Sequence, residues 1–131
     1  MALITWSDAL KRGIAFQDDD HEQAVHLMNA LQTCSDEDLP RLYAELHTHT
    51  KEHLAREDEL MERIGFFAKD MHMAEHARVL GEMQAFQDKL DAGDLAAVRA
   101  YVEQAVPEWF LNHLDSMDTA TAMFARQMGE S

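Results

Sequence analysis

Residues 36–65 read DEDLPRLYAELHTHTKEHLAREDELMERIG, and this stretch decides the fold class. Apolar and ionisable side chains recur along it every three or four residues, at Leu42, Leu46, His49, His53, Glu57, Leu60 and Ile64. This spacing places them on one face of an α-helix. Pro40 in the first turn and Gly65 after the last turn are typical of helix ends, and Ser35 or Asp36 is expected to cap the start. The stretch predicts an amphipathic helix with histidines on its inner face.

Three further helices are predicted around it. They span about residues 18–33 with Asp18 as the cap, residues 69–90, and residues 94–126, where Pro107 is expected to kink or split the helix. The last two carry their own inner stripes, which comprise His72, His76, Val79, Met83, Phe86 and Leu90, and then Val98, Val102, Val106, Trp109, His113 and Met117. Only 5 Gly and 2 Pro interrupt the helix-forming composition. We expect an all-α, up-down-up-down four-helix bundle, preceded by an arm over residues 1–17.

Length and charge narrow the class of protein. The 131 residues suit one domain, 1–131, that buries roughly two-thirds of the surface of its unfolded chain. A formal charge of -14 disfavours nucleic acid and anionic membranes as partners. No segment resembles a membrane span or a signal peptide, so no membrane insertion is expected. The lone Cys34 fits a reducing, cytoplasmic location as a free thiol.

The inner faces of the predicted helices carry ionisable residues that an apolar core would exclude. His53 and Glu57 are four residues apart, as are His72 and His76, and His113 is followed five residues later by Asp118. Burying such groups without partners is costly, so a shared metal is the economical partner. Imidazoles with carboxylates suit iron, zinc or copper. His26 and His47 lie off the stripes and are expected to be solvated.

Taken together, these motifs resemble the hemerythrin family over nearly the whole chain. The matching motifs are Trp6, Gly13-Ile14, Asp18 followed by His21, Asn29-Ala30-Leu31, His53-Leu54-Ala55-Arg56-Glu57, Gly65-Phe66, His72-Met73-Ala74-Glu75-His76, and Trp109, His113 and Asp118 in their relative positions. The order and spacing of seven metal-binding positions make this resemblance specific. It implies a four-helix bundle that holds two non-haem irons.

The resemblance also implies a role for each residue. His72, His76 and His113 would complete one six-coordinate iron, while His21 and His53 would serve the other, which keeps a vacant position. Glu57 and Asp118 would bridge the two irons (Fe2+/Fe3+), together with an oxo or hydroxo bridge from solvent. Dioxygen would bind reversibly at the vacant position, beside Phe110 and Leu114. An oxygen-consuming enzyme as recipient, and a monomer or homo-oligomer, complete the expected partners.

Four positions depart from the family pattern without removing a metal ligand. Leu54 replaces a phenylalanine, Gln17 stands where an apolar residue is usual, and Phe110 stands where leucine is common. His49 takes the place of an aromatic residue one turn before His53. It could hydrogen-bond to a ligand or merely fill a gap, and both interpretations stay open.

Three functions are compatible with such a site. An oxygen carrier or store is favoured over an oxygen or redox sensor, because the chain ends soon after Asp118 and carries no output domain; a separate partner could supply that output. A di-iron oxidase or peroxidase ranks third, since sites of that kind are rich in carboxylates and use Glu-x-x-His motifs. We therefore expect a binding protein, not an enzyme. A bundle with merely solvated histidines would require seven coincidences.

Overall fold

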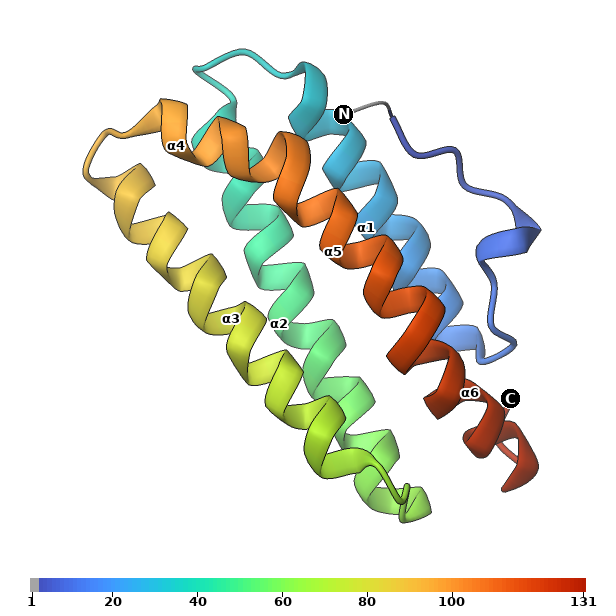
Figure 1. The fold of residues 1–131 in the computed structure, drawn as a ribbon. Helices are drawn as coiled ribbons and strands as arrows, with labels where there is room; N and C mark the ends of the chain where they lie inside the picture. Colours follow the sequence, from blue (N-terminus) through green and yellow to red (C-terminus); the bar gives the residue numbers. More distant parts are fainter. Residues whose placement is uncertain (1–2) are drawn as a thin grey trace.

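The computed structural model describes residues 3–131, which form four antiparallel helical rods in up-down-up-down order (Figure 1). Three rods are the single helices α1 (Ala15–Thr33), α2 (Leu39–Ile64) and α3 (Lys69–Asp91). The fourth is built in sequence from α4 (Leu95–Ala100), η2 (Tyr101–Ala105), α5 (Val106–His113), η3 (Leu114–Asp118) and α6 (Thr119–Gln127). The part of the chain described contains no strand, and none of its helices is long and apolar enough to cross a membrane. The predicted all-α bundle is confirmed.

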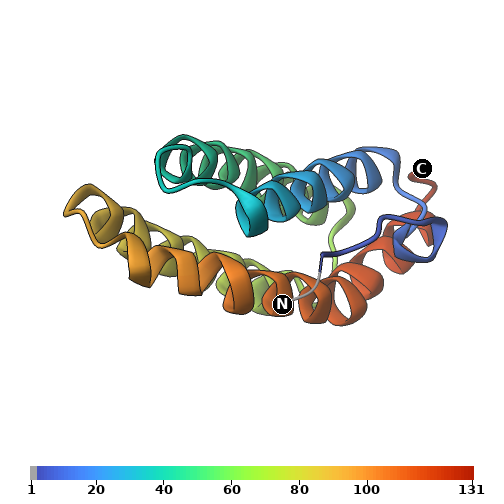
Figure 2. The same ribbon diagram turned by 90° about the horizontal axis from the view of Figure 1, so that it is seen from above.

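The rods pack in two layers, with α1 and α2 in one and α3 and the fourth rod in the other (Figure 2). Buried apolar side chains form two separate clusters. The larger fills one end of the bundle and includes Val25, Tyr43, Leu46, Met83, Val98 and Phe110. The smaller consists of Ile14, Leu60, Ala122 and Ala125. The predicted metal ligands occupy intermediate positions along each rod, so a polar layer lies between two apolar ones.

Most helix ends follow the local chemistry of the sequence. Gly65 ends α2 with a left-handed φ of 65°, and its N–H donates to the carbonyl groups of Glu62 and Met61. Asp94 caps α4, where its side chain accepts the N–H of Ala97 at 3.2 Å. Pro40 lies in the first turn of α2, as predicted.

The starts of α1 and α2 differ from the expectations. Helix α1 begins at Ala15, so the expected arm is shorter by three residues, and Asp18 is not its cap. Asp18 instead accepts the N–H groups of Arg12 at 2.7 Å and Gly13 at 3.1 Å, which fixes the arm against the first turn. Asp38, rather than Ser35 or Asp36, precedes α2.

Side-chain contacts fasten the arm along the bundle, and its residues 1–2 lie outside the described range. Asn29 on α1 donates to the carbonyl of Ile4 at 2.8 Å and accepts the N–H of Ile4 at 2.9 Å. Arg12 bonds to Thr119 at 2.8 Å and Asp115 at 2.9 Å on the fourth rod. The arm therefore joins α1 to the segment that carries Asp118.

The fourth rod stays helical through Pro107 because a wider turn precedes it. Residues of η2 form a π-helical turn, and α5 follows with Pro107 in its first turn, where a missing N–H costs little. A second π-helical turn, η3, lies between His113 and Asp118. The predicted interruption at Pro107 thus takes the form of a change in helix type.

Candidate metal centre

All four rods contribute to one buried group of metal-binding side chains. Helix α1 supplies His21, α2 supplies His53 and Glu57, α3 supplies His72 and His76, α5 ends at His113, and η3 ends at Asp118. Each of these seven residues is at most 7% exposed, although all are ionisable. The structure therefore brings together all the side chains that the sequence marked as metal ligands.

Three histidines converge on one side of this group, the three-histidine half. The Nε2 atom of His113 lies 3.0 Å from that of His72 and 3.2 Å from that of His76. Asp118 Oδ1 lies 3.2 Å from His72 Nε2 and 3.1 Å from His113 Nε2, while Glu57 Oε1 lies 3.3 Å from His76 Nε2. Three nitrogens and two carboxylate oxygens thus face a common point.

His21 and His53 form the two-histidine half beside it. Glu57 Oε2 lies 3.0 Å from His53 Nε2 and 3.6 Å from His21 Nε2. Asp118 Oδ2 lies 3.2 Å from His21 Nε2. Glu57 and Asp118 each turn one oxygen to each half, which is the arrangement that lets a carboxylate bridge two cations.

The outer nitrogens of three imidazoles are held by hydrogen bonds. Nδ1 of His53 bonds to Asp20 at 2.8 Å, that of His76 to Asp58 at 2.7 Å, and that of His72 to Thr121 at 2.8 Å. A carboxylate only accepts, so a neutral His53 or His76 must carry its proton on Nδ1. Its Nε2 lone pair is then left facing the cluster, as a metal ligand requires.

The π-helical turn η3 explains how residues five apart meet at one site. In an α-helix, neighbours on a face are three or four residues apart, so Asp118 would point away from His113. In η3 the N–H of Thr119 donates to the carbonyl of Leu114, five residues back, and the turn is widened. Thr119 Oγ1 also donates to that carbonyl at 2.7 Å. The extra residue brings Asp118 onto the face of His113.

The electrostatics of the group call for a positive charge. Burial by itself would lower the pKa of His53, but the charge of Glu57 and the hydrogen bond to Asp20 raise it to about 10. Burial would likewise raise the pKa of Glu57, yet the charge of His53 holds it well below its ordinary value. The carboxylates are thus anionic, and without a metal they draw protons onto the imidazoles.

Several inward atoms lack partners within residues 3–131, and this supports a metal. His21 Nε2, Glu57 Oε1 and Asp118 Oδ1 are buried without a hydrogen bond, because their contacts to neighbours have ion-pair distances but not hydrogen-bond geometry. Buried polar atoms are nearly always satisfied, so such a cluster needs a further partner. Nitrogen and oxygen donors of this kind fit transition metals such as iron.

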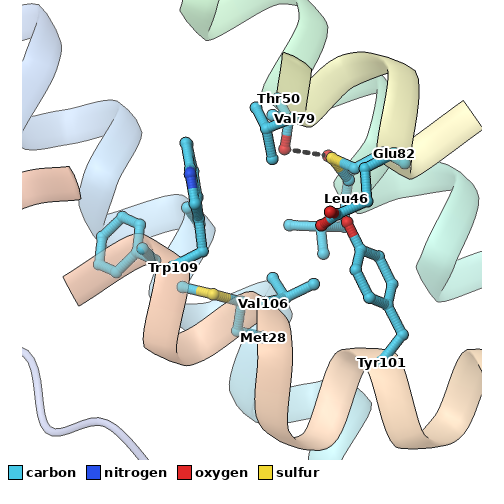
Figure 3. A pocket seen from close by; sticks show the side chains of 11 residues that line it. Met28, Leu46, Thr50, Val79, Glu82, Tyr101, Val106 and Trp109 are labelled. Atoms are coloured by element: carbon cyan, nitrogen blue, oxygen red, sulfur yellow. Dashed lines mark hydrogen bonds between the residues drawn. The ribbon is translucent and has the colours of Figure 1, made fainter. Parts of the chain in front are cut away.

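Two small cavities lie near the centre, and one of them reaches its ligands. One, the site cavity, has a volume of about 40 Å³ and is lined by His21, His53, His113 and Asp118 together with His49, Thr50, Leu54, Ala24, Trp109 and Phe110. The other, the inner cavity, is also about 40 Å³ and lies between Trp109 and Tyr101 (Figure 3). Ala24, Thr50, Trp109 and Phe110 line both, so they form the wall between them.

The two residues expected beside the vacant position differ in placement. The Phe110 ring meets the His21 ring edge-on with centroids 5.7 Å apart, on the two-histidine half. Leu114 is fully buried in the larger apolar cluster and is not among the described residues that line the site cavity. Of these two residues, Phe110 is the one that lines the site cavity.

The remaining histidines fall into three environments. His26 is exposed, as expected. His47 was expected to be solvated, and this was wrong: it is 4% exposed. His49 Nε2 bonds to the carbonyl of Asp20 at 2.9 Å, and its ring stacks parallel to His53 with centroids 6.4 Å apart. His49 thus braces the segment that carries Asp20 rather than bonding directly to a ligand.

Comparisons with known proteins agree with this geometry. Residues 12–124 match the hemerythrin HHE cation binding domain. The chain belongs to the hemerythrin family. Bacteriohemerythrins from Ralstonia nicotianae and Aquifex aeolicus are 33% and 32% identical to it, over 98% of this chain and 93% and 99% of theirs. Crystal structures of wild-type hemerythrin and of a leucine-to-alanine variant superpose with TM-scores of 0.82 and 0.83, at 24% and 25% identity, covering 95% of this chain and 98% of theirs.

Proposed function

We propose that this hemerythrin-family protein binds dioxygen reversibly at a non-haem di-iron centre, as a carrier or store and without enzymatic turnover. The proposal rests on one observation: the two halves of the centre offer different numbers of donor atoms. His72, His76 and His113 with one oxygen from each carboxylate give five donors, whereas His21 and His53 with the other two oxygens give four. A solvent-derived oxo or hydroxo group shared by both metals would leave one open position, on the two-histidine half.

When bound, the iron pair supplies the electrons that reversible dioxygen binding requires. The protein's part is to hold the ligands and to keep the open side dry. Asp20 and Asp58 fix the rings of His53 and His76 through Nδ1 and make them stronger ligands. Phe110 places apolar surface against His21 on the two-histidine half, and Trp109 stacks on His113. Both line the site cavity, which suits a small apolar gas.

The donor set favours binding over oxidase or peroxidase chemistry. Five imidazoles and two carboxylates carry less negative charge than the carboxylate-rich sites of ferritin-like enzymes. Anionic ligands are the ones that stabilise strongly oxidising, highly charged iron. A set dominated by neutral imidazoles therefore favours a centre that releases oxygen unchanged.

Metal content tests the proposal most simply. Protein loaded anaerobically with ferrous iron and desalted should hold two irons per chain by elemental analysis. His76→Ala should lower the iron content and the thermal stability together, because metal binding adds to the free energy of folding. His26→Ala, which changes an exposed histidine, is the matched control and should keep both irons. One zinc per chain, or no retained iron, would refute the di-iron centre.

A further inference from the structure

Gln17 is a buried amide at a position where the family pattern usually has an apolar side chain. It lies one helical turn before His21 on α1 and is 0% exposed. Its Nε2 donates a hydrogen bond of 2.9 Å to Oε2 of Glu57, forty residues away on α2. The amide therefore reaches a carboxylate of the metal centre.

The oxygen that Gln17 contacts is specific to one half. Glu57 Oε2 is the atom 3.0 Å from His53 Nε2, whereas Glu57 Oε1 faces His76. Among the residues described, the amide of Gln17 has this hydrogen bond alone. Its influence on a bound metal pair is therefore directed to the two-histidine half.

The amide carries a cost that an apolar side chain of similar size would not. Gln17 Oε1 is buried and has no hydrogen-bond partner within residues 3–131. The amide cannot turn over to relieve this, because its oxygen would then face the anionic Glu57. An unsatisfied buried acceptor lowers folding stability. Packing alone therefore disfavours an amide at this position. The hydrogen bond that its N–H group donates to Glu57 explains why it is there.

We propose that Gln17 is a positioning residue that tunes the two-histidine half of the metal centre, an inference that rests on the proposed di-iron function. An N–H donor bonded to Oε2 draws electron density from this oxygen and weakens it as a ligand. Weakening an anionic ligand costs the ferric state more stabilisation than it costs the ferrous state. Gln17 therefore holds the reduction potential of the centre higher than an apolar residue would, and protects the ferrous form.

The test replaces Gln17 by methionine, which keeps the length of the side chain and removes the donor. Gln17→Met should retain two irons per chain. Its midpoint potential should be lower, by a shift that corresponds to about tenfold in the oxidised-to-reduced ratio, about 59 mV for one electron. The metal-free variant should unfold at the same or a higher temperature than wild type, because the orphaned acceptor is gone; a purely structural role predicts a fall.

Gln32→Met is the matched control. Gln32 lies on the same helix, and its amide donates to the carbonyl groups of Val102 and Glu103, away from the ligands. This variant should leave the potential unchanged. Gln17→Leu is the second variant, and it should lower the potential as Gln17→Met does, because it also removes the donor to Glu57 and introduces no new polar atom.

The outcomes are distinguishable. Wild-type potential in Gln17→Met or in Gln17→Leu, with two irons bound, would overturn the inference and leave the di-iron proposal standing. A failure of both variants to hold iron while Gln32→Met holds it would show that Gln17 assembles the site rather than tunes it, and would also overturn the inference. Wild-type protein that holds no iron would refute the proposed function itself.

Discussion

Phe110 stands between two apolar cavities, only one of which reaches the histidines. Its ring lies edge-on to His21, and it is 8% exposed. Loss of bound oxygen as peroxide requires a proton and water, so a ring that keeps the two-histidine half dry should slow oxidation of the ferrous centre. The neighbouring Trp109 is fixed separately, since its indole N–H donates to Glu75 at 2.9 Å.

Removing this ring should therefore lower the folding stability without changing the iron content. Phe110→Ala should lower the free energy of unfolding by about 3–5 kcal/mol and keep both irons, since no ligand changes. The absorption that oxygen induces should decay faster than in wild type. Phe86→Ala is the control, because Phe86 stacks on Tyr101 and lines neither cavity. Equal decay rates in wild type and Phe110→Ala, at equal iron content, would show that Phe110 only packs the core.

His47 provides a pH dependence that is separate from the metal ligands. Burial, and then the charge of Lys51, hold the pKa of His47 below its ordinary value. The stability it contributes is therefore complete above about pH 6.5 and is lost as the pH falls through the folded pKa, since the unfolded chain takes up a proton first.

The His47 prediction is checked by urea unfolding of metal-free protein between about pH 8 and pH 5. Wild type should lose stability relative to His47→Gln as the pH falls. The exposed His26 provides a control, His26→Gln, which should run parallel to wild type. A constant difference between wild type and His47→Gln across this range would contradict the assigned shift.

At the residue level, spacing predicted which side chains would meet but not what holds them. Six of the seven positions could be found from the residues because a buried stripe has no other use for histidine and carboxylate, whereas His21 was identified through the family resemblance. Asp20 and Asp58, which fix two of the imidazoles, were not identified, because each lies next to a stripe and its partner is on another helix. His47 was misassigned because α2 packs against both α1 and α3, which buries more than one narrow face.

At the element scale, the π-helical turn η3 positions Asp118 in the metal centre. Inserting one alanine after the exposed Ser116 should lengthen the spacing between His113 and Asp118 to six residues and rotate Asp118 by about 100° away from His113. Iron content should fall, while far-ultraviolet circular dichroism should still report a helical bundle. Ser116→Ala, which keeps the residue count, should bind two irons. Two irons in the insertion variant would mean that the turn does not position Asp118.

Helix periodicity and the residues typical of helix ends predicted the rods well but not the π-helical turns within the fourth rod. The ends at Gly65 and Asp94 follow from strong local signals, and α3 matched its expected span within one residue. The start of α1 was missed because Asp18 is used by the backbone of the arm, which is a tertiary contact. The only trace of η3 in the sequence is the spacing of five between His113 and Asp118, which gains meaning once both are known to share a site.

Over the whole molecule, the polar layer lies between two apolar clusters, so metal binding and folding are coupled. The larger cluster gives one end of the bundle a core, whereas Ile14, Leu60, Ala122 and Ala125 form a much smaller one. Helices meet at the metal centre between them, and without a cation the carboxylates there can be balanced only by protonated imidazoles. A bound cation would therefore join four rods that otherwise share a charged interior.

Reversible oxygenation is the most direct test of the central claim. Wild-type protein is loaded with ferrous iron without oxygen, its iron content is measured, and optical spectra are followed through alternating oxygen and argon. The account predicts an absorption that appears under oxygen, disappears under argon and returns over repeated cycles, at two irons per chain. A single irreversible oxidation, with no recovery of the ferrous spectrum under argon, would contradict it.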